Sequence, residues 1–448
     1  MRIRTLLLST ALTLMLGGPA SAETIIDALV SAYQNNADLM AAREELRVTN
    51  EQRPQALGGW MPTVTLRGNA DEATIDQRIS PSYDRRTLSG ALEYNQTLYR
   101  GGALSATLDQ AENTIRRQRA LLTDTEQTVL LQAGSIFMDV IRDSRTLALN
   151  RNNIAVLEER RRTTRALYDV GDATQADLSQ AEARLAQARA QLIAAQGQLD
   201  ASRATYAQIV GQPPEAPEMP GPVSGLPETL EAAIDLAERW NPVLRASGLA
   251  ETIARDQIRI RRGEMLPSVA LVGRVQEDSY DDPLPLDRQS QASLGVQLTV
   301  PLYQSGADHA RLREAKKRAN QRQLETVSQL RKVQEQVIRA WRDLQTARAS
   351  VGALDEQIAA ARLALESVRR EVEIGRRPLL DLLDAQQELL DAEVNRTGRQ
   401  RDVVVGELTL LSTIGALTAE SLALPTDLYD PLADYEATKW RLFGTGIR

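Results

Sequence analysis

Residues 168–189 read YDVGDATQADLSQAEARLAQAR, a glycine-centred turn followed by a regular pattern of small and apolar residues. Gly171 stands where a chain reversal needs a positive φ, which glycine adopts without steric cost. Beyond the turn the pattern advances in alternating steps of three and four, through Leu178, Ala181, Leu185, Ala188, Leu192, Ala195, Leu199, Ser202, Tyr206 and Ile209. Such spacing is a coiled-coil seam. The stretch therefore predicts a hairpin of two long helices.

The run before this turn is unusually long for a single helix. Residues 102–169 contain no proline, and only Gly134 interrupts them. At 1.5 Å per residue they would form a helix of about 100 Å, whereas the returning helix at about 172–210 reaches only about 58 Å. The segment at about 25–58 would add about 50 Å. The two shorter helices could therefore stack end to end beside the long one.

The whole unit occurs twice, with an offset of 205 residues that becomes 204 after one deletion. The matches are Asn36 with Asn241, Leu39 with Leu244, WMPTVTL at 60–66 with MLPSVAL at 265–271, LYRGGA at 98–103 with LYQSGA at 302–307, Phe137 with Trp341, Gly171 with Gly375, Asp177-Leu178 with Asp381-Leu382, and Gly211 with Gly415. We expect a first repeat at 23–211, a Pro/Gly-rich linker at 212–228, a second repeat at 229–417 and a tail at 418–448. The tail has no assignment from its residues.

Short alternating segments separate the helices within each repeat. The clearest is SLGVQLTVPL at 293–302, where every second residue is apolar and the others are mostly small or polar, over the length of a membrane strand. We expect strands at about 267–280 and 289–302, and weaker counterparts at about 62–75 and 86–99. Two soluble hairpins that cap a helical bundle are the alternative for the same pattern.

Four membrane strands cannot close into a barrel, and an open sheet edge in lipid leaves backbone groups without hydrogen bonds. The smallest bacterial barrels have about eight strands, so copies of the chain must combine. A dimer would supply eight strands and a trimer twelve, and the residues alone do not choose between them.

Composition fixes the compartment and excludes several classes of function. Residues 1–22 have a basic start, a short apolar run and an Ala-Ser-Ala end, which predicts an export signal cleaved after Ala22. The chain has no cysteine, one histidine (His309) and a formal charge of −7. No nucleophile with a base, phosphate-binding glycine loop or cluster of metal ligands is visible. These features argue against an enzyme, a cofactor and nucleic-acid binding.

Several motifs together resemble the TolC-type outer-membrane efflux proteins, most closely the subgroup that serves type I secretion. They are NADLMAAREE and WMP in the opening segment, LYRGGA, EQTVLLQAGSIFMDVIRD at 126–143, the 168–189 stretch, and their counterparts in the second repeat. The likeness extends to about residue 417. It implies a mainly α fold with membrane β: a homotrimer whose 12-stranded outer-membrane β-barrel continues into a 12-helix periplasmic α-barrel. Without a lipobox cysteine, the chain is similar to the unlipidated branch.

The resemblance also implies partners and site residues. The chain would be a passive duct recruited by a periplasmic adaptor and an inner-membrane ABC or RND transporter. Its two hairpin turns, at 168–178 and 372–385, would form a periplasmic tip that docks the adaptor through Val170, Gly171, Thr174, Ile374 and Gly375. Gating and selectivity would fall to Arg377, Asp381, Asp384 and Asp177. Val372 stands where a prototype carries a tyrosine of the closing network.

Asp381 and Asp384 are three residues apart and would project from one helix face. In three copies around an axis they would form two carboxylate rings that attract cations. The plainer alternative is that they complement the positive end of a helix dipole just after Pro378. For the whole chain, the alternative function is a periplasmic coiled-coil structural or adaptor-like protein without a membrane barrel.

Overall fold

The computed structural model describes residues 23–77, 80–281 and 288–446, so the predicted signal peptide lies outside the described residues. In chain order the elements are α1 (Ile25–Asn35), α2 (Ala37–Asn50), α3 (Gln52–Gly58), β1 (Thr63–Gln77), β2 (Ser80–Arg100), α4 (Ala103–Val170), α5 (Gln175–Val210), α6 (Leu230–Trp240), α7 (Pro242–Gly263), β3 (Ser268–Asp281), β4 (Arg288–Thr299), α8 (Ala307–Glu373), α9 (Leu379–Thr413) and α10 (Ala433–Thr438). Their contacts divide the chain into two compact units, and α4, α8 and α9 each contribute to both.

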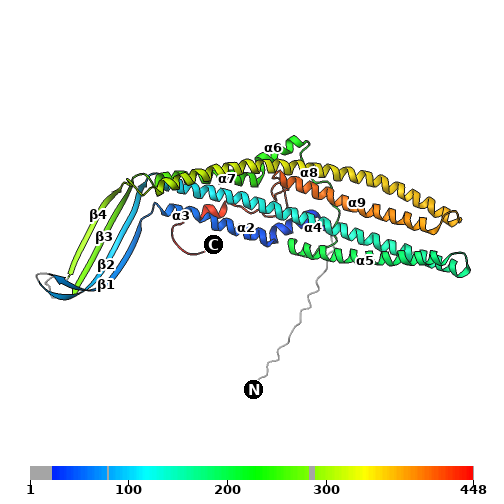
Figure 1. Ribbon diagram of the computed structural model, residues 1–448, viewed down its shortest axis with the longest axis horizontal. Coiled ribbons are helices and arrows are strands. Elements are labelled where there is room, and N and C mark those ends of the chain that lie inside the picture. Colours follow the sequence, from blue (N-terminus) through cyan, green and yellow to red (C-terminus); the bar gives the residue numbers. More distant parts are fainter. Residues whose placement is uncertain (1–22, 78–79, 282–287, 447–448) are drawn as a thin grey trace, which may run out of the picture. The chain divides into compact units, whose positions relative to one another are not determined.

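Unit 1 contains the residues up to Asn36, Leu130–Gly225 and Asp343–Leu408. It holds two antiparallel helical hairpins, α4 with α5 and α8 with α9, whose turns lie at the same end of the unit (Figure 1). The unbroken α4 of 68 residues confirms the long helix expected from the run without proline.

The predicted seam of α5 is its buried face. Seven of its ten positions are buried, namely Leu178, Ala181, Leu185, Ala188, Leu199, Ser202 and Tyr206. The second repeat begins an equivalent seam on α9, at Leu382, Ala385, Leu389 and Ala392, which Arg396 and Arg399 then interrupt. Arg396 reaches Asp355 on α8, and Arg399 pairs with Asp402 at 3.0 Å. An ion pair thus continues the α8–α9 contact where apolar packing stops.

The prediction of a single helix over about 25–58 is wrong. The structure has three helices there, α1, α2 and α3. The first break is at Asn36, whose backbone is extended (φ −68°, ψ 123°) and whose amide Nδ2 donates to the carbonyl of Ile209 at 3.0 Å. In unit 2 its repeat counterpart, Asn241, ends α6 in the same way and donates to the carbonyl of Thr413 at 3.0 Å. Each asparagine thus satisfies a carbonyl in the last turn of a returning helix.

Glu23, the expected first residue after cleavage, is fixed within unit 1. Its carboxylate accepts hydrogen bonds from the Tyr206 hydroxyl and, at 2.8 Å, from the backbone N–H of Glu215. Burial and the neighbouring carboxylate raise the pKa of Tyr206, so the phenol stays protonated as a donor.

Unit 2 contains Ala37–Val129, Leu226–Arg342 and the residues from Thr409 onward. It contains a four-stranded antiparallel sheet in the order β1-β2-β3-β4, which leaves β1 and β4 as edges (Figure 1). Partners across the strands place apolar residues on one face, as in Leu66 with Leu92 and Leu92 with Val275. Many of these side chains are exposed: Val64, Leu66, Leu92, Val275, Leu294, Val296 and Leu298.

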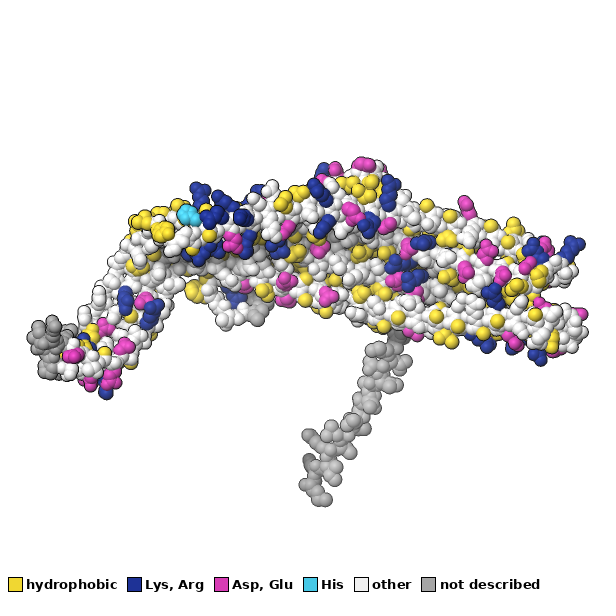
Figure 2. Space-filling view, viewed as in Figure 1, with side chains coloured by type: hydrophobic (Ala, Val, Ile, Leu, Met, Phe, Trp, Pro, Cys, Tyr) yellow, Lys and Arg dark blue, Asp and Glu magenta, His cyan; other side chains and the backbone are white. Residues whose placement is uncertain are grey.

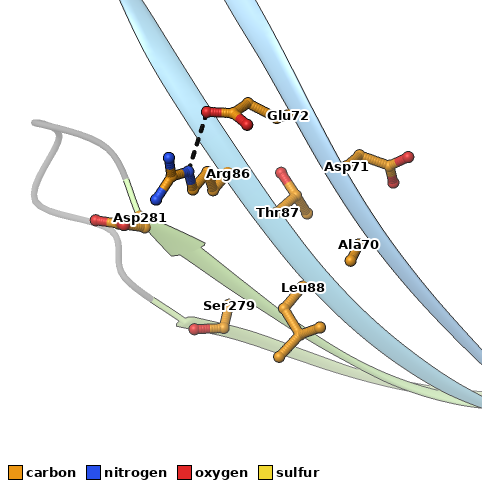
Figure 3. A pocket seen from close by; sticks show the side chains of 8 residues that line it. All are labelled: Ala70, Asp71, Glu72, Arg86, Thr87, Leu88, Ser279 and Asp281. Atoms are coloured by element: carbon orange, nitrogen blue, oxygen red, sulfur yellow. Dashed lines mark hydrogen bonds and ion pairs between the residues drawn. The ribbon is translucent and has the colours of Figure 1, made fainter.

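Charged side chains mark the end of the sheet near the β1–β2 and β3–β4 connections. Arg86 Nε lies 3.0 Å from Glu72 Oε1, and Asp71 and Asp281 lie close by around a shallow pocket of about 310 Å³ (Figure 3). None of the described helices is both long enough and apolar enough to cross a membrane.

The tail at 418–448, for which no structure was expected, packs within unit 2. Its short helix α10 contacts α2, where Asn50 Nδ2 donates to Asp434 Oδ2 at 2.8 Å. The Arg53 guanidinium lies 4.4 Å from the ring centre of Trp440 and donates to the carbonyl of Lys439. A cation on aromatic faces therefore holds the tail in place.

Candidate functional site

The first turn joins α4 to α5 in unit 1. Gly171 has φ +89°, and the N–H of Asp172 bonds back to the carbonyl of Leu167 at 2.8 Å, which closes the end of α4. A Cβ at Gly171 would meet nothing within 4 Å. The glycine is therefore required by its backbone conformation and not by crowding.

Thr174 and Asp177 form a capping box at the start of α5. The N–H of Asp177 donates to Thr174 Oγ1 at 3.2 Å, while Asp177 Oδ2 accepts from the Thr174 N–H at 2.9 Å. Hydrogen bonds from the Thr174 hydroxyl and N–H hold the pKa of Asp177 below its usual value. Asp177 thus has a local role that keeps it ionised.

The second turn joins α8 to α9 with the same backbone design. Gly375 has φ +73°, and the N–H of Arg376 bonds to the carbonyl of Glu371 at 2.8 Å. Val372 is half-buried, and its carbonyl accepts the N–H of Gly375 at 3.0 Å.

Arg377 forms its ion pairs inside its own hairpin. Its Nε lies 2.6 Å from Glu371 Oε2, and its Nη1 lies 3.6 Å from Asp381 Oδ2. The three side chains are about half-exposed, so each pair contributes modestly to stability. The arrangement ties the last turn of α8 to the first turn of α9.

A small apolar cluster joins the two hairpins near their turns. Leu383 of α9 is buried against Leu157 of α4 and against Leu185 and Ala188 of α5. Beside this cluster, Arg184 Nη2 lies 2.5 Å from Asp384 Oδ1. Because Arg184 precedes Leu185 and Asp384 follows Leu383, the ion pair borders the apolar contact.

A second charged link between the hairpins lies farther along the helices of unit 1. Arg401 Nε of α9 lies 2.9 Å from Asp139 Oδ1 of α4, and Arg142 Nη1 lies 2.8 Å from the same oxygen. Arg142 Nε also pairs with the buried Asp143 at 2.8 Å. Two cations thus share Asp139.

Of the residues expected at the gate, Arg377 and Asp381 pair with each other and Asp384 pairs with Arg184 of the other hairpin. Asp177 bonds to Thr174 in its own helix cap. Asp381 and Asp384 lie on successive turns of α9, and each has an arginine partner. Sequence reasoning missed Arg184 and Glu371. The one available signal was that Arg184 and Asp384 each directly precede a residue of a predicted seam, Leu185 and Ala385.

The exposed tip residues divide into two kinds. Val170 and Ile374 are large apolar side chains with 73% and 65% exposure. Thr174 is used as a helix cap, whereas Gly171 and Gly375 set the turns.

Among the described residues no group of three or more His, Asp or Glu side chains is arranged to hold a metal ion.

Comparison with known proteins assigns the chain to a family. The family model described as outer membrane efflux protein matches residues 28–212 and 233–416, one match for each repeat. The chain belongs to the outer membrane efflux protein family. It is 33% identical over 433 residues to the outer membrane efflux protein BepC of Brucella suis, covering 96% of this chain and 94% of that protein.

One further relative and one solved structure extend the comparison. The proteases secretion protein PrtF of Dickeya chrysanthemi is 26% identical over 445 residues, with 94% of both chains covered. The solved structure of the outer-membrane channel OprN has a TM-score of 0.77 at 21% identity, covering 87% of this chain and 90% of that chain. The predicted resemblance is confirmed. The chain is an outer-membrane efflux channel of the TolC type with a large periplasmic portion.

Proposed function

We propose that three copies of this chain form the outer-membrane exit duct of a tripartite export machine. Four strands from each copy would close a 12-stranded barrel, and the helical hairpins would form a 12-helix periplasmic tunnel. The duct performs no chemical step and needs no cofactor. Its gate is the region of the two hairpin turns.

The observation that carries this proposal is the open sheet of unit 2. Among the described residues, both edge strands, β1 and β4, lack a partner on one side, and apolar side chains on them are exposed, with Leu66 at 79% and Leu294 at 76%. Lipid accommodates exposed apolar side chains, but it offers no hydrogen bonds to the unpaired backbone groups of an edge strand. Pairing β4 of one copy with β1 of the next would leave the apolar side chains in lipid and would give the edge backbone its hydrogen bonds.

The gate follows from the ion pairs near the turns. Arg377 holds α8 to α9, and the Arg184–Asp384 pair holds one hairpin to the other. We propose that the Arg184 pair contributes to the closing network in which Val372 lacks a tyrosine hydroxyl. Asp381 and Asp384 then face the shared axis and favour cations, while Asp177 contributes to closure from the first turn.

The exposed tip gives the docking surface for a periplasmic adaptor. Val170, Gly171, Thr174, Ile374 and Gly375 would contact it, and an inner-membrane ABC or RND transporter would complete the machine. PrtF is described as a proteases secretion protein, and on this likeness we assign the chain to type I protein secretion. BepC, described as an efflux protein, supports efflux of small molecules as a second role.

The absence of cysteine from the chain makes thiol cross-linking a clean test of assembly. Pairs of cysteines would join Val64 or Leu66 on β1 to Leu294, Val296 or Leu298 on β4, one pair for each variant. Oxidised outer membranes should give a ladder of bands that ends at three chains. The control pair, Leu92→Cys with Val275→Cys, lies on neighbouring strands of one chain and should give no ladder. A ladder that ends at two chains, or none from any pair, would overturn the trimer.

A further inference from the structure

Because the unit is duplicated, the contact between the start of α4 and α7 has an equivalent, between the start of α8 and α3. The first contact forms within one chain. Within unit 2 the start of α4, in the first repeat, packs against α7, in the second. The contacts are Asn113 Nδ2 to Asp256 Oδ2 at 2.8 Å, Arg259 Nη2 to Asp109 Oδ2 at 2.6 Å and Gln110 Nε2 to Gln257 Oε1 at 3.0 Å. The equivalent contact would join the start of α8 to α3 of another copy.

The approach of α7 to α4 is very close. Gly101 and Gly102 have φ values of +56° and +80°, and a Cβ at Gly263 would lie 2.8 Å from the carbonyl oxygen of Gly101. No real Cβ tolerates such a distance, so Gly263 is required here by crowding.

The same backbone is present in the second repeat, but the close contact is missing. Ser305 and Gly306, 204 residues after Gly101 and Gly102, have φ values of +52° and +76°. Gly58, 205 residues before Gly263, would meet nothing within 4 Å if it carried a Cβ. The turn before α8 and the end of α3 are thus built like the two sides of the α4–α7 contact, yet α3 has no such neighbour at Gly58.

Counting by the same offsets gives the side chains that would meet. Asn113 corresponds to Lys317 on α8, and Asp256 corresponds to Glu51 beside α3. Both are exposed, and neither side chain has an ion-pair partner within the part of the chain that the structure describes. The Asn113–Asp256 hydrogen bond of the α4–α7 contact therefore corresponds to a pair of opposite charges, Lys317 and Glu51, in the contact between copies.

Charge also distinguishes the two helix starts. Residues 307–322 contain six Lys or Arg and two Asp or Glu, whereas the equivalent residues 103–118 contain two of each. Figure 2 shows basic side chains gathered near the start of α8. The basic start of α8 is therefore complementary to the carboxylate of Glu51.

We propose that the start of α8 docks on α3 of the next copy, with Lys317 paired to Glu51 of the partner subunit. This inference rests on the proposed trimer and names a contact that would hold it together. Ser305 cannot approach as Gly101 does, because a Cβ at Gly101 would lie 2.3 Å from the carbonyl oxygen of Gly263. The contact between copies is therefore wider, and Lys317 and Glu51 are each longer than their counterparts Asn113 and Asp256.

Cysteine pairs in the otherwise cysteine-free chain test the contact directly. Lys317→Cys with Glu51→Cys, treated with a short thiol cross-linker in outer membranes, should give a ladder that ends at three chains. The control replaces Lys332, an exposed lysine about 22 Å farther along α8, together with Glu51. It should give no ladder.

A charge exchange tests the pairing without cross-linking. Lys317→Glu and Glu51→Lys should each lower the heat resistance of the trimer, and the two together should restore it. An exposed ion pair changes an equilibrium by about 1.4-fold to fivefold per contact. A double variant no more stable than the single ones overturns the pairing.

The two proposals fail in different ways. A β1–β4 ladder that ends at three chains, with no ladder from the Lys317 and Glu51 pair, would keep the trimer and reject this contact. If both ladders are absent, the assembly itself is rejected.

Discussion

Arg184 Nη2 lies 2.5 Å from Asp384 Oδ1, and this ion pair joins the first helical hairpin of the chain to the second. The two residues are 200 positions apart and sit beside the buried Leu185 and Leu383. Since these hairpins carry the two turns of the proposed gate, the pair is placed to resist their separation. It also gives one of the two proposed ring carboxylates a cationic partner.

Replacing Arg184 by Gln should loosen the gate. The pair is partly exposed and contributes about 0.2–1 kcal/mol per copy, so three copies together shift the closed state by a few-fold to about a hundredfold. We expect larger single-channel conductance and greater uptake of large antibiotics. The matched control is Arg189→Gln, which breaks a 3.0 Å pair to Glu158 within one hairpin. Equal conductance in both variants would remove Arg184 from the gate.

Arg377→Ala should loosen the gate in a different way. It removes both the 2.6 Å contact to Glu371 and the contact to Asp381, so the turn between α8 and α9 loses its charged clamp. Conductance and antibiotic uptake should both rise. Arg376→Ala is the control, because Arg376 has no ion pair among the described residues. Parental behaviour of Arg377→Ala would refute the clamp.

The capping box at the first turn predicts a pH dependence. Hydrogen bonds from Thr174 lower the pKa of Asp177 below 3.8, so the carboxylate stabilises the fold above that pH. The stabilisation is lost as pH falls through the lowered pKa. Thr174→Ala should cost about 1 kcal/mol at neutral pH. Hydrogen exchange in the first turn of α5, corrected for the intrinsic rate, measures both effects.

The other capping box, Thr24 with Asp27, is the control for this experiment. Thr24→Ala should increase exchange at the start of α1 and leave α5 unchanged. If Asp177→Asn protects α5 at pH 7 as well as the parent does, the capping account is wrong.

Gly134 in the middle of α4 is explained by a close approach of α9. A Cβ there would lie 2.4 Å from Leu408 Cδ1, so Gly134→Ala should cost about 1–3 kcal/mol despite the better helix propensity of alanine. Gly197→Ala on α5 meets nothing within 4 Å and should gain about 0.5–1 kcal/mol. Thermal melting followed by circular dichroism should rank the two variants on opposite sides of the parent. The reverse order would contradict the packing of Gly134.

The elements that the sequence predicted correctly are those with a periodic or local signal. The α5 seam repeats over many turns, and Gly171 and Gly375 stand at matched positions with the positive φ that only a turn requires. The strands were visible because apolar residues alternate along them. Each signal lies within one stretch of sequence, so no knowledge of tertiary structure was needed.

The features that were missed depend on single contacts between distant residues. Asn36 breaks the first helix by binding a carbonyl 173 positions away, and nothing around it differs from other polar helix ends. The Arg184–Asp384 pair and the stacking of the buried Arg53 on Trp440 likewise join residues that are far apart in the sequence. The one sequence signal for this break was the duplication, because Asn36 and Asn241 occupy equivalent positions and each donates to a carbonyl of a returning helix.

The proposed duct is a water-filled passage lined at its narrow end by Asp381 and Asp384. Planar-bilayer recording of the purified protein tests it most directly, with the double variant Asp381→Asn/Asp384→Asn and the control Glu388→Gln/Asp391→Asn on the same helix. We expect discrete, cation-selective currents whose reversal potential moves toward zero in the first variant and not in the control. Absence of current from trimer-sized protein, or selectivity unchanged by the Asp381 and Asp384 substitutions, would contradict it.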